Sequence, residues 1–140
     1  MFVVDDAIRE LLDKISAQMR RDYSEMLRKL NLHVGQDNLL CKLWSNNGIT
    51  QMQLTELLNC EPPTITNMVK TLEKKGFVYR KKDQVDGRVS RVYLTEKGLA
   101  VREPISEIWS NQQDKLLIGL SGEERILLHK YLHQMEKNLR

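Results

Sequence analysis

The stretch from Ile49 to Leu94 constrains the fold most, because two short helical patterns meet there at a tight turn and a basic hairpin pattern follows. Thr50 is a favourable N-cap for the first helix, which we expect over residues 51–58. Pro62 and Pro63 fit the first turn of the second helix, where a proline removes no intrahelical hydrogen bond. Two short helices joined in this way predict a helix-turn-helix unit.

The hairpin pattern begins after Gly76, because glycine commonly ends a helix in the left-handed conformation. Two runs rich in β-branched and aromatic residues follow, at Phe77–Lys82 and Val89–Leu94. The polar segment between them predicts a wide loop rather than a two-residue turn. We therefore predict a mainly α fold with a small β-hairpin, in which residues 34–94 form a winged helix-turn-helix lobe.

Long helical patterns flank this lobe on both sides. Apolar residues recur at steps of three, four and seven from Asp5 to Leu30, which predicts one helix with a continuous apolar stripe. Such a helix is longer than a small domain needs for its own core, so we expect part of the stripe to pack against another chain. Residues 1–33 and 95–140 are therefore expected to be N- and C-terminal dimerisation helices of a single domain, 1–140.

Local signals refine this outline. Ile49 is expected to make a minimal strand contact. Pro104 cannot donate to the carbonyl of Ala100, which predicts a kink or a local break in the helix there. Ser121 and Glu124 have the spacing of a capping box at the start of the last helix. The residues expected to face inward from the first helix of the helix-turn-helix are Leu54, Leu57 and Leu58.

The composition excludes several classes of protein. Hydrophobic residues make up 41% of the chain, but no run approaches the roughly 18 unbroken apolar residues of a membrane span. The N-terminal residues lack the basic start and the apolar run of a signal peptide, so we expect a cytoplasmic protein. No phosphate-binding glycine loop, activated nucleophile or metal motif is present, so we expect neither an enzyme nor a cofactor or metal site.

Positive charge is concentrated in the central stretch. From Glu61 to Arg91 the sequence has eight Lys or Arg residues and four acids, whereas the remainder of the chain carries a net charge of −1. A local excess of this kind indicates a surface that faces a polyanion. Judged on charge alone, a plain solvated face is an equally good interpretation.

The second helix of the helix-turn-helix has a width that fits the DNA major groove. Its short hydroxyl and amide side chains, Thr64, Thr66 and Asn67, are expected to reach base edges, with Asn67 favouring adenine. Lys70 and Lys74 lie further along the helix and are expected to meet phosphates. This helix is therefore predicted to read the DNA sequence.

The hairpin loop is expected to lie over the adjacent minor groove. Arg88 is the candidate for insertion, because a narrow minor groove concentrates negative potential. Asp86, two residues earlier, is expected to hold the arginine or the loop in place rather than to contact DNA. The complete set of candidate DNA-binding residues is Gln51, Pro63, Thr64, Thr66, Asn67, Lys70, Lys74, Arg88 and Arg91.

Three motifs at fixed spacing sharpen this interpretation. A Leu-Glu-x-x-Gly stop ends at Gly76, an Asp-x-Arg wing ends at Arg88, and a Leu-Thr-x-x-Gly exit ends at Gly98. Together they resemble the MarR family of bacterial and archaeal transcriptional regulators, and the resemblance covers nearly the whole chain. It implies a homodimer, a palindromic operator, repression by occlusion, and often release by a small phenolic ligand or by thiol oxidation. Gly87 departs from the pattern, because many members have a second basic residue there.

Several alternatives stay open beside this hypothesis. Cys41 and Cys60 are expected to be structural, since neither falls in the first helix, where the thiol sensors of the family carry their reactive cysteine. His129 and His133 have the spacing of a metal pair but no obvious third ligand, so a solvated face is expected. A winged-helix module that binds protein rather than DNA is the alternative function. Residues that could line a pocket for a small aromatic effector, or simply belong to the core, are Tyr23, His33, Trp44 and Trp109.

Overall fold

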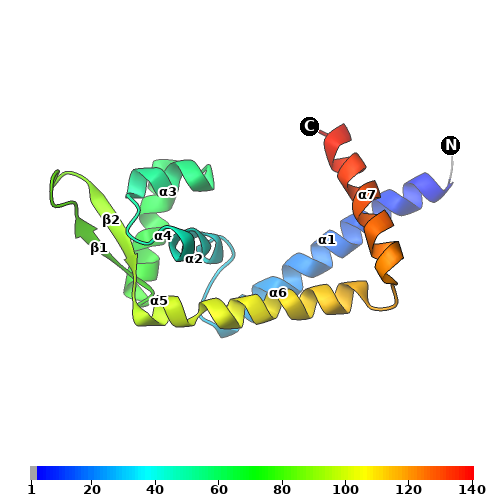
Figure 1. The fold of residues 1–140 in the computed structure, drawn as a ribbon, viewed down its shortest axis with the longest axis horizontal. Coiled ribbons are helices and arrows are strands. Elements are labelled where there is room, and N and C mark those ends of the chain that lie inside the picture. Colours follow the sequence, from blue (N-terminus) through cyan, green and yellow to red (C-terminus); the bar gives the residue numbers. More distant parts are fainter. Residues whose placement is uncertain (1–2) are drawn as a thin grey trace. The chain divides into compact units, whose positions relative to one another are not determined.

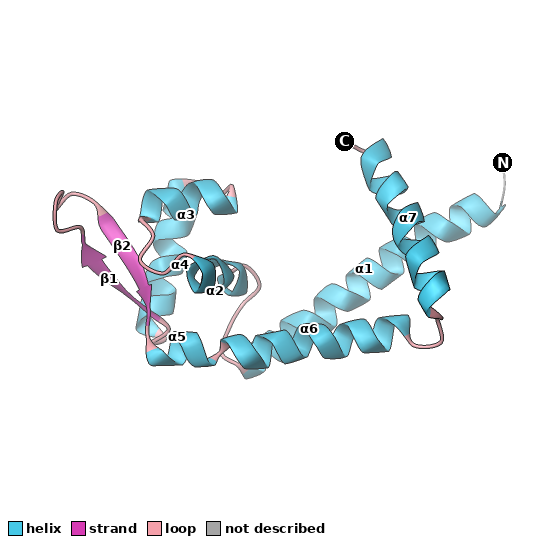
Figure 2. Ribbon diagram, in the orientation of Figure 1, coloured by secondary structure: helices cyan, strands magenta, loops and turns pink. Residues whose placement is uncertain are grey.

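The computed structural model describes residues 3–140, which form seven helices and a two-stranded antiparallel sheet (Figures 1 and 2). The predicted mainly α fold with a small β-hairpin is confirmed. The chain divides into two compact units, Met1–Ile108 and Trp109–Arg140, and each is described by itself. The elements are α1 (Val3–Lys29), α2 (Gln36–Ser45), α3 (Gln51–Leu58), α4 (Pro62–Lys74), β1 (Val78–Lys82), β2 (Ser90–Leu94), α5 (Glu96–Ala100), α6 (Arg102–Leu117) and α7 (Gly122–Asn138).

The helix-turn-helix consists of α3 and α4. The Thr50 hydroxyl accepts from the Gln53 backbone N–H at 3.1 Å, and the Thr50 N–H donates to Gln53 Oε1 at 3.0 Å. Asn59 takes the turn in the left-handed conformation, with φ 50°, which asparagine tolerates better than most residues. The expected N-cap is confirmed, and Gln53 completes a capping box that the sequence analysis did not identify.

One inward position predicted in α3 is wrong. Leu54 is fully buried and Leu58 is half-buried, but the side chain of Leu57 is 48% exposed. Successive residues of an α-helix lie about 100° apart around its axis. Since α3 is short and buries only a narrow face, Leu57 is carried to the solvent side while Leu58 packs against the core.

The wing consists of β1, the loop at residues 83–89 and β2. The two strands pair antiparallel. The Val92 N–H also donates to the Ile49 carbonyl at 3.0 Å, and the Val92 carbonyl accepts from the Gly48 N–H at 2.9 Å. The strand contact expected at Ile49 is therefore confirmed, and it anchors β2 to the segment that leads into α3.

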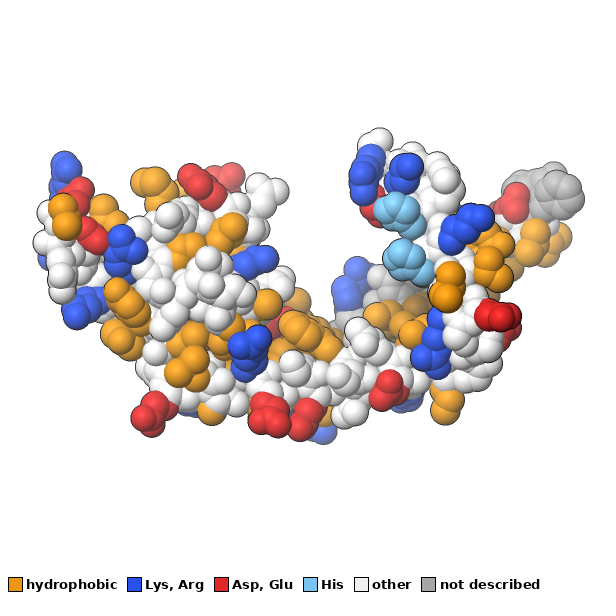
Figure 3. All heavy atoms as spheres, viewed as in Figure 1, with side chains coloured by type: hydrophobic (Ala, Val, Ile, Leu, Met, Phe, Trp, Pro, Cys, Tyr) orange, Lys and Arg blue, Asp and Glu red, His pale blue; other side chains and the backbone are white. Residues whose placement is uncertain are grey.

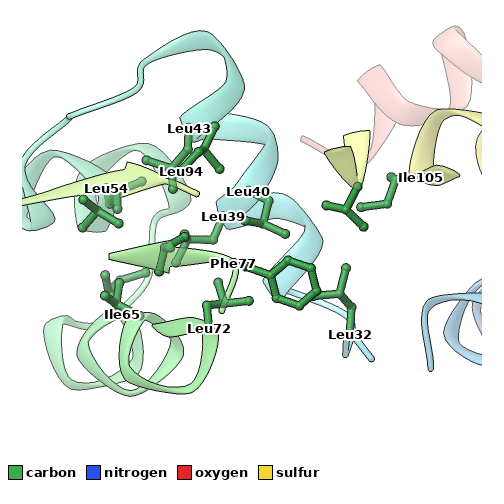
Figure 4. Close-up of a cluster of buried hydrophobic side chains, with 14 of the residues drawn as sticks. Leu32, Leu39, Leu40, Leu43, Leu54, Ile65, Leu72, Phe77, Leu94 and Ile105 are labelled. Atoms are coloured by element: carbon green, nitrogen blue, oxygen red, sulfur yellow. The ribbon is translucent and has the colours of Figure 1, made fainter. Parts of the chain in front are cut away.

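Buried side chains of α2, α3, α4 and the wing form one core in the first unit (Figure 4). Phe77, at the start of the hairpin, points among leucines that include Leu32 and Leu72 (Figure 4). Gly98 lets α5 approach this point, because a Cβ at that position would lie 2.1 Å from the Phe77 carbonyl oxygen. The core thus fixes the wing against α4 and ties both to the start of α5.

Two helices carry apolar side chains that their own unit leaves exposed. In α1 the residue that is fully buried is Leu27, while four apolar residues of the N-terminal half expose 39–56% of their surface. These four residues are Ile8, Leu11, Leu12 and Ile15, and α7 likewise exposes Ile126, Leu127, Tyr131 and Leu132. Contiguous apolar surface of this kind is uncommon on a monomeric protein and commonly marks an interaction site.

The breaks expected in the last part of the chain are confirmed. The helical pattern divides into α5, which ends at Ala100, and α6, which begins at Arg102 and carries Pro104 in its first turn. At α7, the Glu124 N–H donates to Ser121 Oγ at 3.2 Å and the Ser121 N–H donates to Glu124 Oε1 at 2.8 Å. Across the described residues, none of the helices has the length and apolar character that crossing a membrane requires.

Candidate nucleic-acid interface

One face of α4 presents four exposed residues, Pro63, Asn67, Lys70 and Lys74. Their spacing of four, three and four residues places them in a single row, opposite the buried residues of the same helix. Among the described residues, the side chains of Asn67, Lys70 and Lys74 form no hydrogen bond or ion pair with any other. Thr64 is also exposed but lies at the margin of this face, because it follows Pro63 by about 100° around the helix.

Two candidate residues bind each other. Gln51 Nε2 donates to Thr66 Oγ1 at 2.9 Å, and the Thr66 hydroxyl donates to the Pro62 carbonyl at 3.0 Å. This chain of bonds joins the first turn of α3 to the first turn of α4. The Thr66 hydroxyl is therefore occupied within the protein, which the sequence could not show because the two partners are 15 residues apart.

The wing loop is organised by two carboxylates. Asp83 Oδ2 accepts from the backbone N–H groups of Val85 at 3.1 Å and Asp86 at 3.0 Å, while Asp83 Oδ1 accepts from Arg91 Nε at 2.7 Å. Asp86 Oδ1 accepts from both the backbone N–H and Nε of Arg88, at 3.0 and 3.1 Å. Asp86 thus contacts Arg88 directly, and Asp83 has a role that the sequence analysis missed.

The two arginines of the wing differ in exposure. The Arg88 side chain is 91% exposed, so its guanidinium projects into solvent although Asp86 orients it. The Arg91 side chain is 38% exposed, and Arg91 Nη1 donates to the Gly48 carbonyl at 2.9 Å. Arg91 therefore ties the base of the loop to the segment before α3, a contact that was not expected for a DNA-binding candidate.

Hydrogen bonding lowers the pKa of both wing carboxyls. The guanidinium of Arg91 is the main cause of the lowered pKa of Asp83, and the guanidinium of Arg88 is the main cause of the lowered pKa of Asp86. A lowered pKa means that the folded loop favours the carboxylate, so its bonds stabilise the loop fully above the usual aspartate pKa of 3.8. That stabilisation is lost as the pH falls through the lower pKa of the folded state.

We therefore expect the wing to stay ordered at about pH 4 and to loosen only as the pH falls through the lowered pKa of Asp83 and of Asp86, where the two carboxyls take up protons. Arg91→Gln should raise the pKa of the Asp83 carboxyl toward its usual value, because it removes the largest cause of the shift. A carbon-13 titration of the Asp83 carboxyl by nuclear magnetic resonance measures both effects. An unchanged Asp83 pKa in the variant would show that Arg91 does not hold this carboxylate.

A shallow hollow of about 310 Å³ lies between the start of α3 and the wing. Arg80 and Arg88 line it from the wing, and Gln51 and Met52 line it from α3. Arg80 is held by Glu73, whose Oε1 accepts from Arg80 Nε at 3.2 Å and Nη2 at 3.0 Å. The hollow therefore brings an amide side chain of α3 together with two basic side chains of the wing.

The charge count of the sequence overstates the free positive charge. Arg80, Arg88 and Arg91 are paired with acids, and Lys75 Nζ donates to Gln36 Oε1 at 3.1 Å. The basic residues of the central stretch that have no such partner among the described residues are Lys70, Lys74, Lys81 and Lys82. Figure 3 shows Lys and Arg side chains gathered over the hairpin, together with acidic ones.

The expected effector-pocket residues are engaged in different places. The Tyr23 hydroxyl donates to the buried carboxylate of Asp37, which joins α1 to α2. Trp44 Nε1 donates to the Gly98 carbonyl at 2.9 Å, which joins α2 to α5. His33 is exposed, and Trp109 belongs to the second unit. Asp37 was not identified from the sequence, because its partner lies 14 residues away.

The remaining candidates show no ligand cluster. Cys41 and Cys60 are free and half-buried, and Cys60 Sγ donates to the Leu58 carbonyl at 3.3 Å. The rings of His129 and His133 stack with centroids 6.1 Å apart. Within residues 3–140, no group of three or more potential metal ligands comes together.

Comparison with known proteins identifies the lobe that carries this interface. Residues 32–90 match the model of the MarR family. The organic hydroperoxide resistance transcriptional regulator of Bacillus subtilis (strain 168) is 33% identical to the chain, covering 92% of the chain and 86% of that protein. The chain belongs to the MarR family. It is a MarR-family transcriptional regulator with a DNA-binding winged helix, and the matches indicate no enzymatic family.

Solved structures agree with this assignment. The structure of the transcriptional regulator SlyA is 32% identical, with a TM-score of 0.73, covering 96% of this chain and 94% of that one. A MepR variant of S. aureus, solved bound to an oligodeoxyribonucleotide, is 26% identical, with a TM-score of 0.69 and full coverage of both chains. The MarR architecture therefore extends over nearly the whole length of this protein.

Gly87, the departure from the MarR pattern, has no structural reason to be glycine. A Cβ at this position would meet no atom within 4 Å, and its φ lies outside the positive range. We expect Gly87→Arg to raise affinity for the operator, by roughly threefold to tenfold per dimer, because it adds a cation beside Arg88 without strain. Titration of a labelled operator at two salt concentrations measures the gain, which should shrink at the higher salt. An unchanged affinity at both salt concentrations would place this part of the loop away from DNA.

Proposed function

We propose that this protein is a repressor that binds a palindromic operator as a homodimer and is released by a small-molecule effector. The observation that carries the proposal is the outward face of α4, whose amide and ammonium groups have no partner among the described residues. Beside it stands a wing whose Arg88 is 91% exposed and already oriented by Asp86. Unpaired donors on a helix, next to an exposed arginine on a loop, fit adjacent grooves of a DNA duplex.

We propose that α4 lies in the major groove. Pro63 and Asn67 at its start then face base edges, with the Asn67 amide pairing with adenine. Lys74 lies about 16 Å along the helix from Pro63. Lys70 and Lys74 therefore meet phosphates where the helix leaves the groove. Thr64, at the margin of the face, contacts the near wall of the groove. This division places sequence reading in the first two turns of α4.

The wing is proposed to follow the phosphate backbone to the minor groove. Gln51 and Arg80 border the hollow through which the backbone runs, and Arg88 enters the minor groove beyond it. For Arg91 we propose an indirect role, because its guanidinium already bonds Asp83 and the Gly48 carbonyl. It holds the wing at the distance from α3 that the two grooves require.

The homodimer is proposed to form through residues 1–33 and 95–140, outside the lobe at 34–94. The exposed apolar residues of α1 and those of α7 support this, since each set is apolar surface that its own unit does not cover. A dimer would place the two copies of α4 about one helical turn of DNA apart, roughly 10 base pairs between half-site centres. Sedimentation equilibrium tests the dimer directly, and a stable folded monomer would contradict it.

The effector is proposed to be a small aromatic molecule, and the candidate residues of the first unit for binding it are Tyr23, His33 and Trp44. Support comes from Tyr23 and Trp44, whose polar atoms join α2 to α1 and to α5. A ligand that takes over either bond changes how those helices hold the DNA-binding lobe. We place this regulation in the cytoplasm, where the DNA is.

Selection of bound fragments from the source genome tests the proposed function. We expect a small set of fragments to be enriched, each protected over an inverted repeat when footprinted with purified protein. Operators of this kind should overlap promoters if the protein represses by occlusion. Failure to enrich any duplex would leave only the protein-binding alternative, and enrichment of sites without an inverted repeat would contradict the dimeric mode of binding.

A further inference from the structure

The start of α4 has no free backbone donor. Its first two residues, Pro62 and Pro63, have no N–H group. The next two N–H groups, of Thr64 and Ile65, both donate to the Glu61 carbonyl, at 3.0 and 3.3 Å. Helix starts commonly bind phosphate through such groups, but this one offers none.

A carboxylate reinforces this property. Glu61 is the N-cap of α4, is exposed, and makes no side-chain capping hydrogen bond. A negative charge at this point repels a phosphate group. The N-terminal turn of α4, here called its tip, is therefore unsuited to contact with DNA phosphates. In the groove it must face base edges instead.

What the tip does present is apolar. Pro63 exposes its ring in the row that also carries Asn67. Thr66 lies three residues after Pro63 and therefore neighbours it on the helix surface. Its hydroxyl donates to the Pro62 carbonyl and accepts from Gln51 Nε2, so the methyl is the part of Thr66 left to meet a ligand.

Given the proposed DNA-binding function, on which this step rests, we infer that Pro63 and the Thr66 methyl select the 5-methyl group of thymine in each half-site. Among the four standard pairs, only A·T and T·A show this methyl in the major groove, on the side of the thymine. Asn67, four residues after Pro63, can pair with an adenine next to it. The start of α4 thus reads an A·T-containing step through an apolar contact beside an amide contact.

Deoxyuridine tests the inference, because it differs from thymidine only by this methyl group. Each thymine of a selected operator is replaced in turn, in both half-sites, and affinity is measured by fluorescence anisotropy. We expect one or two positions at which the wild-type protein loses about fourfold per methyl group removed, or roughly 15-fold for both half-sites.

Thr66→Ser supplies the decisive comparison, because it keeps the hydroxyl and its two bonds but removes the methyl. It should bind the thymine operator more weakly than the wild type does, and it should lose most of the discrimination between the two operators, the remainder coming from Pro63. Pro63→Ala should reduce the same discrimination. Thr71→Ser is the matched control: its hydroxyl donates to the Asn67 carbonyl at 2.9 Å, but it lies on a different side of α4.

The outcomes distinguish a failure of this inference from a failure of the proposed DNA-binding function. Binding to a selected operator with no sensitivity to deoxyuridine would overturn the thymine contact and leave the regulator intact. Sensitivity to deoxyuridine that is undiminished in Thr66→Ser would assign the methyl contact to another residue and overturn the role given to Thr66. Binding to no duplex at all would overturn both.

Discussion

Replacing Arg88 with alanine is expected to weaken operator binding roughly 100-fold, because a dimer loses one arginine from each of two minor grooves. The thermal stability of the protein should hardly change, since the Arg88 side chain is 91% exposed and its partner lies in the same loop. Anisotropy with a labelled operator measures the first effect, and calorimetry measures the second. An equal loss of stability and affinity would make Arg88 a structural residue.

Arg140→Ala is the matched control for this experiment. Arg140 is also an exposed arginine paired with an acid, Glu136 at 2.7 Å, but it lies at the end of the chain, outside the proposed interface. Arg140→Ala removes the same charge as Arg88→Ala and should leave the affinity for the operator nearly unchanged. A double variant, Arg88→Ala with Asp86→Asn, shows how much of the loss comes from the carboxylate that Arg88 would leave unpaired beside DNA.

Replacing Asn67 with alanine is expected to cost roughly tenfold or more in affinity per half-site, because a bidentate amide–adenine pair is lost. Discrimination at one base pair should disappear with it: the variant should bind A·T and G·C at that position equally. Stability should stay the same or rise slightly, since alanine favours a helix more than asparagine does. Competition with operators altered one pair at a time measures these effects.

Asn111→Ala provides the comparison for this substitution. Asn111 is exposed on α6, so the same change of side chain occurs on a helix that is not proposed to touch DNA. It should leave both affinity and base discrimination as they are in the wild type. If Asn67→Ala weakened binding to every operator by the same factor, Asn67 would contact the backbone rather than a base.

Local sequence signals were sufficient for the elements of the DNA-binding lobe. Thr50 caps α3, the proline pair starts α4, and Gly76 follows its end with φ 86°. Each of these features depends on residues within a few positions of one another, which is the range over which propensities act. The two strands of the hairpin follow in the same way from the two runs rich in β-branched and aromatic residues.

The side-chain pairs of the interface could not be predicted from the sequence. Gln51 reaches Thr66 across the turn, and Arg91 reaches Gly48 from 43 residues away. Such contacts depend on how helices and strands pack against one another. Composition alone does not distinguish a paired Lys or Arg from an unpaired one. The structure therefore changes the interpretation of individual residues: Thr66 offers a methyl rather than a hydroxyl, and Arg91 holds the wing.

Salt dependence of operator binding tests the central claim most directly, because the claim is that the outward face of α4 lies against DNA. We predict that affinity falls steeply with salt for the wild type. For Lys70→Ala combined with Lys74→Ala, the logarithmic slope should be smaller by about 3–4, since a dimer then neutralises four fewer phosphates. A slope that is flat, or that is the same in both proteins, would contradict the account.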